Sequence, residues 1–159
     1  MKKIIIITIT AILFVVLDIR TYANTNALSD VFGQYLQKVC KIAEPAKNQT
    51  YIVIDIASCP PCLKKYVPAL QQLLKSDVKN LSIIVVGSRN TPNPPKWFLD
   101  IAETWQNIFY DNVSAYRKIN ITPNQSGVVV VKDGKIVEKT IMNMENYEQL
   151  FRKIATNKT

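Results

Sequence analysis

A chain of 159 residues with 48% hydrophobic and 20% charged residues has the size and composition of one packed domain, which argues against a disordered chain. The formal net charge is +8, yet the lysines and arginines are scattered along helix-like segments, so nucleic-acid binding is not expected. With no histidine and only three cysteines, the chain lacks the ligands of a closed zinc site or a histidine-dependent copper site, and no cofactor is expected.

The first 23 residues have the pattern of an export signal. A basic start, Met1-Lys2-Lys3, precedes residues 4–17, which are apolar except for two threonines, and the small-residue sequence Thr21-Tyr22-Ala23 follows. We therefore predict a signal peptide over residues 1–23 and one domain over residues 24–159. The apolar stretch is short for a membrane span, although the charges that follow it leave an uncleaved membrane anchor as the alternative. Export places the domain in the periplasm or at the extracytoplasmic face of the membrane, where disulfides persist.

Hydrophobic periodicity after the signal predicts helices that alternate with strands. Three- and four-residue spacing indicates helices over residues 29–43, 63–74, 96–105 and 145–155, the first with Ser29 or Asp30 as N-cap. Apolar runs indicate strands over residues 51–56, 81–86, 108–110, 128–131 and 135–141, and an Asp133-Gly134 turn joins the last two. The strand, helix and strand between residues 51 and 86 form a parallel unit, so the sequence predicts an α/β domain.

A Cys-x-x-Cys motif, Cys59-Pro60-Pro61-Cys62, lies where the first predicted strand gives way to a helix. The positive end of a helix stabilises a thiolate, which is the reactive form of cysteine, so Cys59 is the candidate nucleophile. The two-residue spacer holds Cys62 within disulfide reach, where it can attack a mixed disulfide as the resolving thiol. A purely structural Cys59–Cys62 disulfide is the less favoured interpretation, because so small a loop gains little from a cross-link.

The motif and the order of elements together resemble the thioredoxin superfamily, and within it the exported TlpA-like and ResA-like thiol-disulfide oxidoreductases. The resemblance spans roughly residues 48–155. Its most specific part is residues 58–65 with Pro68 in the following helix, and residues 108–111, 122–123 and 128–136 look like the later part of that family.

This resemblance implies a thioredoxin-like fold, in which helices flank a central mixed sheet. It implies a cis-proline facing the two cysteines, for which Pro123, preceded by Thr122, is the candidate. Thr122, Pro60 and Pro61 are then the candidate substrate-binding residues. The expected partners are client proteins with disulfides or dithiols and an electron donor in the membrane or envelope, and the chain is expected to be a monomer.

Asp55 is an ionisable residue in an otherwise apolar strand, four residues before Cys59. A buried carboxylate there could accept the proton of Cys62 during resolution. In thioredoxins the buried acid lies six residues before the first cysteine, a position that Val53 occupies in this chain. The alternative for Asp55 is a strand-end carboxylate that caps the turn or points to solvent.

Other cysteine and aromatic residues have a structural and a functional interpretation. Cys40 lies on the apolar side of the first helix, which favours a buried, inert thiol over a third redox centre. The aromatic residues Trp97, Phe98 and Trp105 are interpreted as core rather than as the wall of a partner groove.

The two prolines between the cysteines favour a reductase, because they remove N–H donors that would stabilise a thiolate. A thiol oxidase or isomerase of the same fold, and a non-enzymatic module that binds peptides, remain the alternatives.

Overall fold

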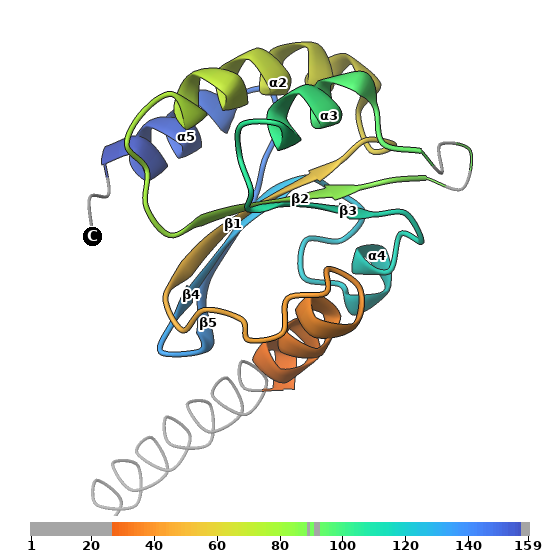
Figure 1. Ribbon diagram of the computed structural model, residues 1–159, viewed down its shortest axis with the longest axis vertical. Coiled ribbons are helices and arrows are strands. Elements are labelled where there is room, and N and C mark those ends of the chain that lie inside the picture. The colour runs from red at the N-terminus through yellow and green to blue at the C-terminus, as the bar shows by residue number, and fades with distance from the viewer. Residues whose placement is uncertain (1–26, 89, 91–92, 157–159) are drawn as a thin grey trace, which may run out of the picture.

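One mixed sheet of five strands forms the centre of the computed structural model, which describes residues 27–88, 90 and 93–156 (Figure 1). The strand order is β3-β2-β1-β4-β5. Strands β1 (Gln49–Asp55), β2 (Leu81–Val86) and β3 (Ile108–Asp111) are parallel, whereas β4 (Gly127–Lys132) is antiparallel to β1 and β5 (Lys135–Ile141) is antiparallel to β4. The predicted signal peptide, residues 1–23, lies outside the described residues.

Helices cover both faces of the sheet (Figure 1). Helices α2 (Pro60–Leu74), α3 (Lys96–Ala102) and α5 (Tyr147–Thr156) pack on one face, and the helix of residues 27–38 with α4 (Tyr116–Ile119) packs on the other. Side chains of β1 point alternately into the two cores, so Ile52 and Ile54 belong to the first and Tyr51 and Val53 to the second. This arrangement confirms the predicted thioredoxin-like α/β fold with a mixed sheet flanked by helices.

The predicted elements differ from the observed ones mainly at their ends. The first helix ends at residue 38 instead of 43, and Ser29 lies inside it, so the predicted N-cap is wrong. The Ser29 hydroxyl accepts a hydrogen bond from the Ile136 backbone N–H at 2.9 Å, which ties this helix to β5. Helix α2 begins at Pro60, three residues before the predicted start, because proline fits the first helical position, where its missing N–H has no partner to lose. None of the described helices is long and apolar enough to cross a bilayer.

Candidate active site

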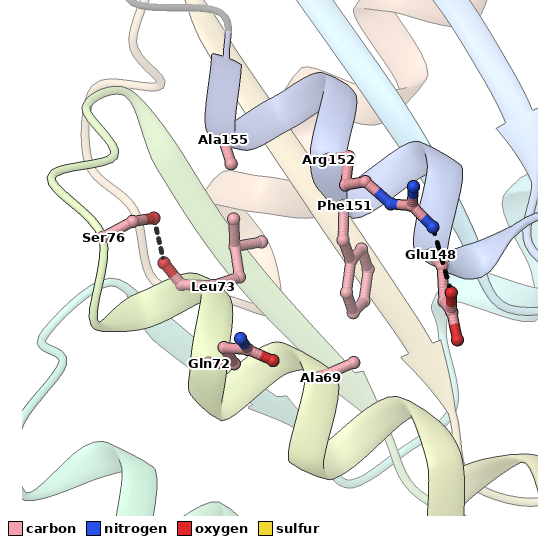
Figure 2. Close-up of a pocket in the computed structure, with 8 residues that line it drawn as sticks. All are labelled: Ala69, Gln72, Leu73, Ser76, Glu148, Phe151, Arg152 and Ala155. Carbon is pink, nitrogen blue, oxygen red and sulfur yellow. Dashed lines mark hydrogen bonds and ion pairs between the residues drawn. The ribbon is translucent and has the colours of Figure 1, made fainter.

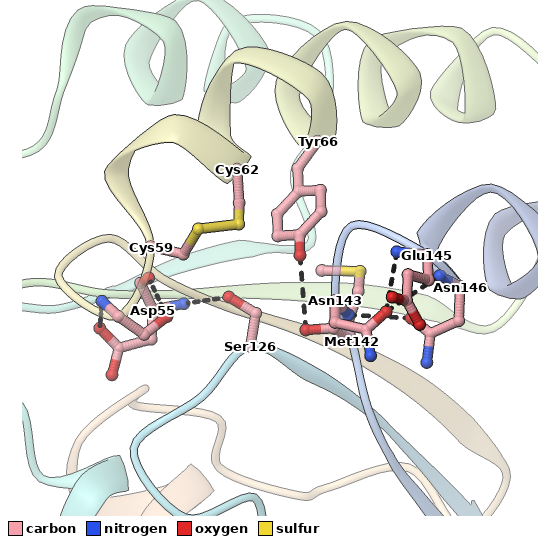
Figure 3. The surroundings of a disulfide bond; sticks show 10 residues. Asp55, Cys59, Cys62, Tyr66, Ser126, Met142, Asn143, Glu145 and Asn146 are labelled. Carbon is pink, nitrogen blue, oxygen red and sulfur yellow. Dashed lines mark hydrogen bonds between the residues drawn. A yellow bond between two sulfur atoms is a disulfide. The ribbon is translucent and has the colours of Figure 1, made fainter.

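Cys59 and Cys62 form a disulfide at the start of α2, directly after the short turn that follows β1 (Figure 3). Their Cα atoms are 5.2 Å apart. The two cysteines differ in exposure, because Cys59 is half-buried whereas Cys62 is only 5% exposed and belongs to the core under α2. A partner molecule therefore reaches Cys59 before Cys62.

The first turn of α2 offers few hydrogen-bond donors to Cys59, which is the N-cap residue of this helix. An N-cap side chain ordinarily accepts a hydrogen bond from the N–H of the second or third helical residue. Pro61, the second helical residue, has no N–H, and the N–H of Cys62, the third, donates to the Cys59 carbonyl at 3.0 Å. Once the disulfide is reduced, the first turn of α2 therefore stabilises a Cys59 thiolate through the helix dipole and not through an N–H of its second or third residue.

A groove of about 480 Å³ runs beside the disulfide. Three segments form its walls: the start of α2, the loop before β4, and the loop after β5. Its lining residues are Ser58, Cys59, Cys62, Tyr66, Asn124, Gln125, Ser126, Met142, Asn143, Met144 and Glu145. The last two segments were not predicted from the sequence. Their position in the sequence could have indicated them, because they lie directly before and after the β4–β5 hairpin. Strand β4 of this hairpin pairs with β1, which leads to the cysteines.

The prediction of a cis peptide bond at Pro123 is wrong, because no bond among the described residues is cis. Thr122 is 2% exposed, and its hydroxyl donates to the Gln125 carbonyl at 2.9 Å and contacts the Tyr116 hydroxyl at 3.0 Å. Neither Thr122 nor Pro123 lines the groove. Residues 124–126 lengthen the loop between Pro123 and β4, so Ser126 lies near the disulfide in the place expected for the proline (Figure 3).

The two prolines of the motif lie in the first turn of α2 with exposed side chains, and they do not line the groove. A partner that docks over Cys59 can still meet them, so their predicted contact with substrate stays a prediction.

Asp55 is placed on the face of β1 opposite Ile54, which packs in the same core as Cys62. Its side chain is 1% exposed and makes a bidentate ion pair with Arg117, at 2.6 and 2.7 Å. This hydrogen-bonded carboxylate raises the pKa of the Arg117 guanidinium. Asp55 also accepts the backbone N–H groups of Ala57 and Ser58 at 3.0 and 3.2 Å. The alternative in which Asp55 caps the turn is therefore correct, whereas its assignment as proton acceptor of Cys62 has no support in this geometry.

Cys40 and the aromatic residues have the structural roles predicted for them. Cys40 is a free thiol, 7% exposed, and burial raises its pKa to about 11. Phe98 is buried, and Trp97 and Trp105 pack half-buried against the same core. These residues line neither the disulfide groove nor a second groove of about 550 Å³ between the C-terminal half of α2 and helix α5 (Figure 2).

No protein-family model matches this sequence, and no curated protein matches it. Among solved structures, the chain is similar to StoA from Bacillus subtilis, at 23% identity over 68% of this chain and 84% of that chain, with a TM-score of 0.42. It is also similar to a thiol:disulfide interchange protein from Bacteroides sp., at 23% identity over 70% of this chain and 76% of that chain, with a TM-score of 0.41.

A third similar structure is the thioredoxin domain of a thiol-disulfide oxidoreductase from Bacteroides vulgatus, at 18% identity over 68% of this chain and 79% of that chain, with a TM-score of 0.43. Because these TM-scores are below 0.5, the assignment of a thioredoxin-like fold rests on the strand order and on the helices that cover each face of the sheet.

Proposed function

We propose that this protein is an exported thiol-disulfide oxidoreductase that reduces disulfides of client proteins. The observation that carries the proposal is the Cys59–Cys62 disulfide at a helix start beside an open groove, with Cys59 half-buried and Cys62 only 5% exposed. This placement gives the two sulfurs different access to a partner. A disulfide that served only to cross-link the chain has no need of such a groove.

The reaction begins with the reduced protein. The Cys59 thiolate attacks one sulfur of a client disulfide, forms a mixed disulfide, and releases the first client sulfur as a thiolate that takes up a proton. The Cys62 thiol then loses its proton to solvent or to a base in the groove, and the resulting thiolate attacks the Cys59 sulfur. This step releases the second client thiol and leaves the Cys59–Cys62 disulfide. Two electrons pass to the client, and a dithiol donor of the membrane or envelope returns two electrons to the protein.

The prolines of the motif support the reducing direction. A strongly oxidising couple needs a stabilised reduced form, which requires donors to the thiolate of the first cysteine. Pro60 and Pro61 supply no N–H, and the N–H of Cys62 is engaged by the Cys59 carbonyl. The disulfide is then favoured over the dithiol, so the reduced protein gives up its electrons readily.

Export is supported by the sequence of residues 1–23, with its basic start, apolar stretch and small-residue cleavage site. Expression of the full chain in a bacterium, followed by fractionation and mass measurement of the N-terminus, tests this part. Recovery of the protein from the cytosol with an intact N-terminus would refute export.

A trapping experiment tests the chemistry. Replacement of the resolving cysteine, Cys62→Ser, should let mixed disulfides with clients accumulate on Cys59, because the second attack is blocked. The double variant Cys59→Ser/Cys62→Ser should trap nothing. The matched control, Cys40→Ser, removes the third cysteine and should leave thiol exchange unchanged. A partner that stays bound without a covalent link to the double variant would instead favour a peptide-binding module.

The direction is tested by the reduction potential of the Cys59/Cys62 couple in the mature protein. We expect a value near that of thioredoxin, about −270 mV. A value near that of strong periplasmic oxidants, about −120 mV, would refute the reductase assignment.

A further inference from the structure

Arg117, on α4, makes three hydrogen bonds at the carboxyl ends of β1 and β2. Its Nε donates to Asp55 Oδ2 at 2.7 Å, and one terminal nitrogen donates to Asp55 Oδ1 at 2.6 Å and to the Gly87 carbonyl at 3.1 Å. The Asp55 carboxylate is 1% exposed and the Arg117 side chain 26% exposed. A bidentate pair of this kind fixes the carboxylate in position and orientation, which a single contact with a flexible ammonium group does not.

Asp55 in turn holds the short segment that leads to Cys59. Its Oδ1 atom accepts the backbone N–H groups of Ala57 and Ser58, and its carbonyl accepts the Ser58 hydroxyl at 3.0 Å. The backbone N–H of Asp55 donates to the Ser126 hydroxyl at 3.0 Å, on the groove side of the sheet (Figure 3). One residue therefore connects the turn before Cys59 with a wall of the groove.

We propose that Arg117 is a positioning residue for the redox couple, acting through Asp55 to hold the 56–58 turn so that Cys59 stays within bonding distance of Cys62. The inference rests on the proposed function only in requiring that the Cys59–Cys62 bond opens and closes. Arg117 lies on the far side of the sheet from the disulfide core and touches neither sulfur. Its effect is conformational: it reduces the range of positions open to Cys59 in the dithiol form.

This restriction predicts a direction for the redox equilibrium. When both thiols are held close together, closing the disulfide costs less conformational entropy, so the disulfide is favoured. Loss of the ion pair leaves the buried carboxylate without its charge partner and loosens the N–H contacts to the turn. The dithiol then gains more freedom than the disulfide, and the disulfide becomes easier to reduce.

The experiment measures the equilibrium between the protein and glutathione at pH 7 and 25 °C. Two glutathione thiols each give one electron and one proton to the protein disulfide, and the products are the dithiol and glutathione disulfide. The test variant is Arg117→Gln, which removes the charge and the bidentate contact. The matched control is Lys118→Gln, which removes an equal charge from the neighbouring exposed residue. Arg117→Lys serves as the conservative variant.

We expect Arg117→Gln to favour the dithiol by about tenfold relative to the parent, which equals about 30 mV for a two-electron couple. Lys118→Gln should stay within about twofold of the parent, and Arg117→Lys should fall between the two. Unfolding is followed in parallel, since a purely structural role lowers the stability of the oxidised and reduced forms equally and leaves the equilibrium unchanged.

An unchanged equilibrium in folded Arg117→Gln, or a shift toward the disulfide, overturns the inference. If Arg117→Gln does not fold, Arg117→Lys is the deciding variant. A shift of its glutathione equilibrium toward the dithiol by about threefold supports the inference, and no shift, or a shift toward the disulfide, overturns it. A failure of the proposed function is recognised separately, because client trapping by Cys62→Ser would then be absent while the glutathione equilibrium still responds to Arg117.

Discussion

The buried thiol of Cys40 should resist alkylation in the folded protein and lose that resistance on unfolding. Burial is the main cause that raises the pKa of Cys40 from 9.0 to about 11, and the buried carboxylate of Asp111 adds to it, whereas a hydrogen bond with Tyr35 opposes it. Only the thiolate reacts. At pH 8 a rise in pKa from 9 to 11 reduces the thiolate fraction about 90-fold, and the 7% exposure of the side chain slows access further.

The assay compares iodoacetamide labelling of the reduced protein at pH 8 in native buffer and in guanidinium, with each cysteine followed by peptide mass. Cys59, which is half-buried and lines the groove, serves as the internal reference and should react quickly in both conditions. Native labelling of Cys40 should be at least about 90-fold slower than denatured labelling. If the two rates differ by less than about tenfold, the thiol is accessible and its assignment as an inert core residue is wrong.

Three further outcomes follow from packing and burial. Gly127→Ala should destabilise the protein by about 1–3 kcal/mol in guanidinium titrations, because the new Cβ would lie 2.8 Å from a β5 carbonyl oxygen. Gly33→Ala, in a helix with open space around it, should instead stabilise by about 1 kcal/mol, and the opposite order would refute this reasoning. Burial raises the pKa of Tyr51 and Tyr116 from 10.0 to about 12. The stability that each neutral tyrosine contributes is therefore fully present below about pH 10 and is lost as the pH rises toward 12, on the order of 2–3 kcal/mol each. Because Tyr51→Phe lacks one of these groups, its free energy of unfolding should fall less steeply between about pH 10 and 12 than that of the parent.

Elements whose signal is local could be predicted from the sequence. Strand β2 has the predicted bounds, because a strand that is buried on both faces is a continuous run of apolar residues. Such a run can be identified in the sequence without knowing which strands pair with it. The β4–β5 hairpin was predicted from Asp133-Gly134, and both residues have the positive φ values that a two-residue turn requires, 50° and 75°. The Cys-x-x-Cys at the start of α2 is local in the same sense, and its position is confirmed.

The rest of the site could not be predicted, because it depends on contacts between distant segments. Thr122-Pro123 suggested a cis-proline, but nothing in a single sequence tells which residue of the following loop lies opposite the disulfide. Arg117 is 62 residues from Asp55, and an arginine next to a lysine in a short segment gives no sign of a buried partner so far along the chain. The three loops of the groove are brought together only by the pairing of β1 with β4 and of β4 with β5.

The alternation of side chains along β1 limits which acid can serve the cysteines. The side chain of Asp55 points to the same face of β1 as Tyr51 and Val53, toward the core that includes α4. Ile54 points to the opposite face, into the core that contains Cys62. An acid on β1 that was to reach Cys62 would have to stand in place of Ile52 or Ile54, where burial would penalise its charge. Among the described residues that line the groove, Glu145 alone carries a carboxylate. In the proposed reaction, the proton that leaves Cys62 would therefore pass to Glu145 or to solvent in the groove, and Asp55 would act on the couple only through the backbone that it holds.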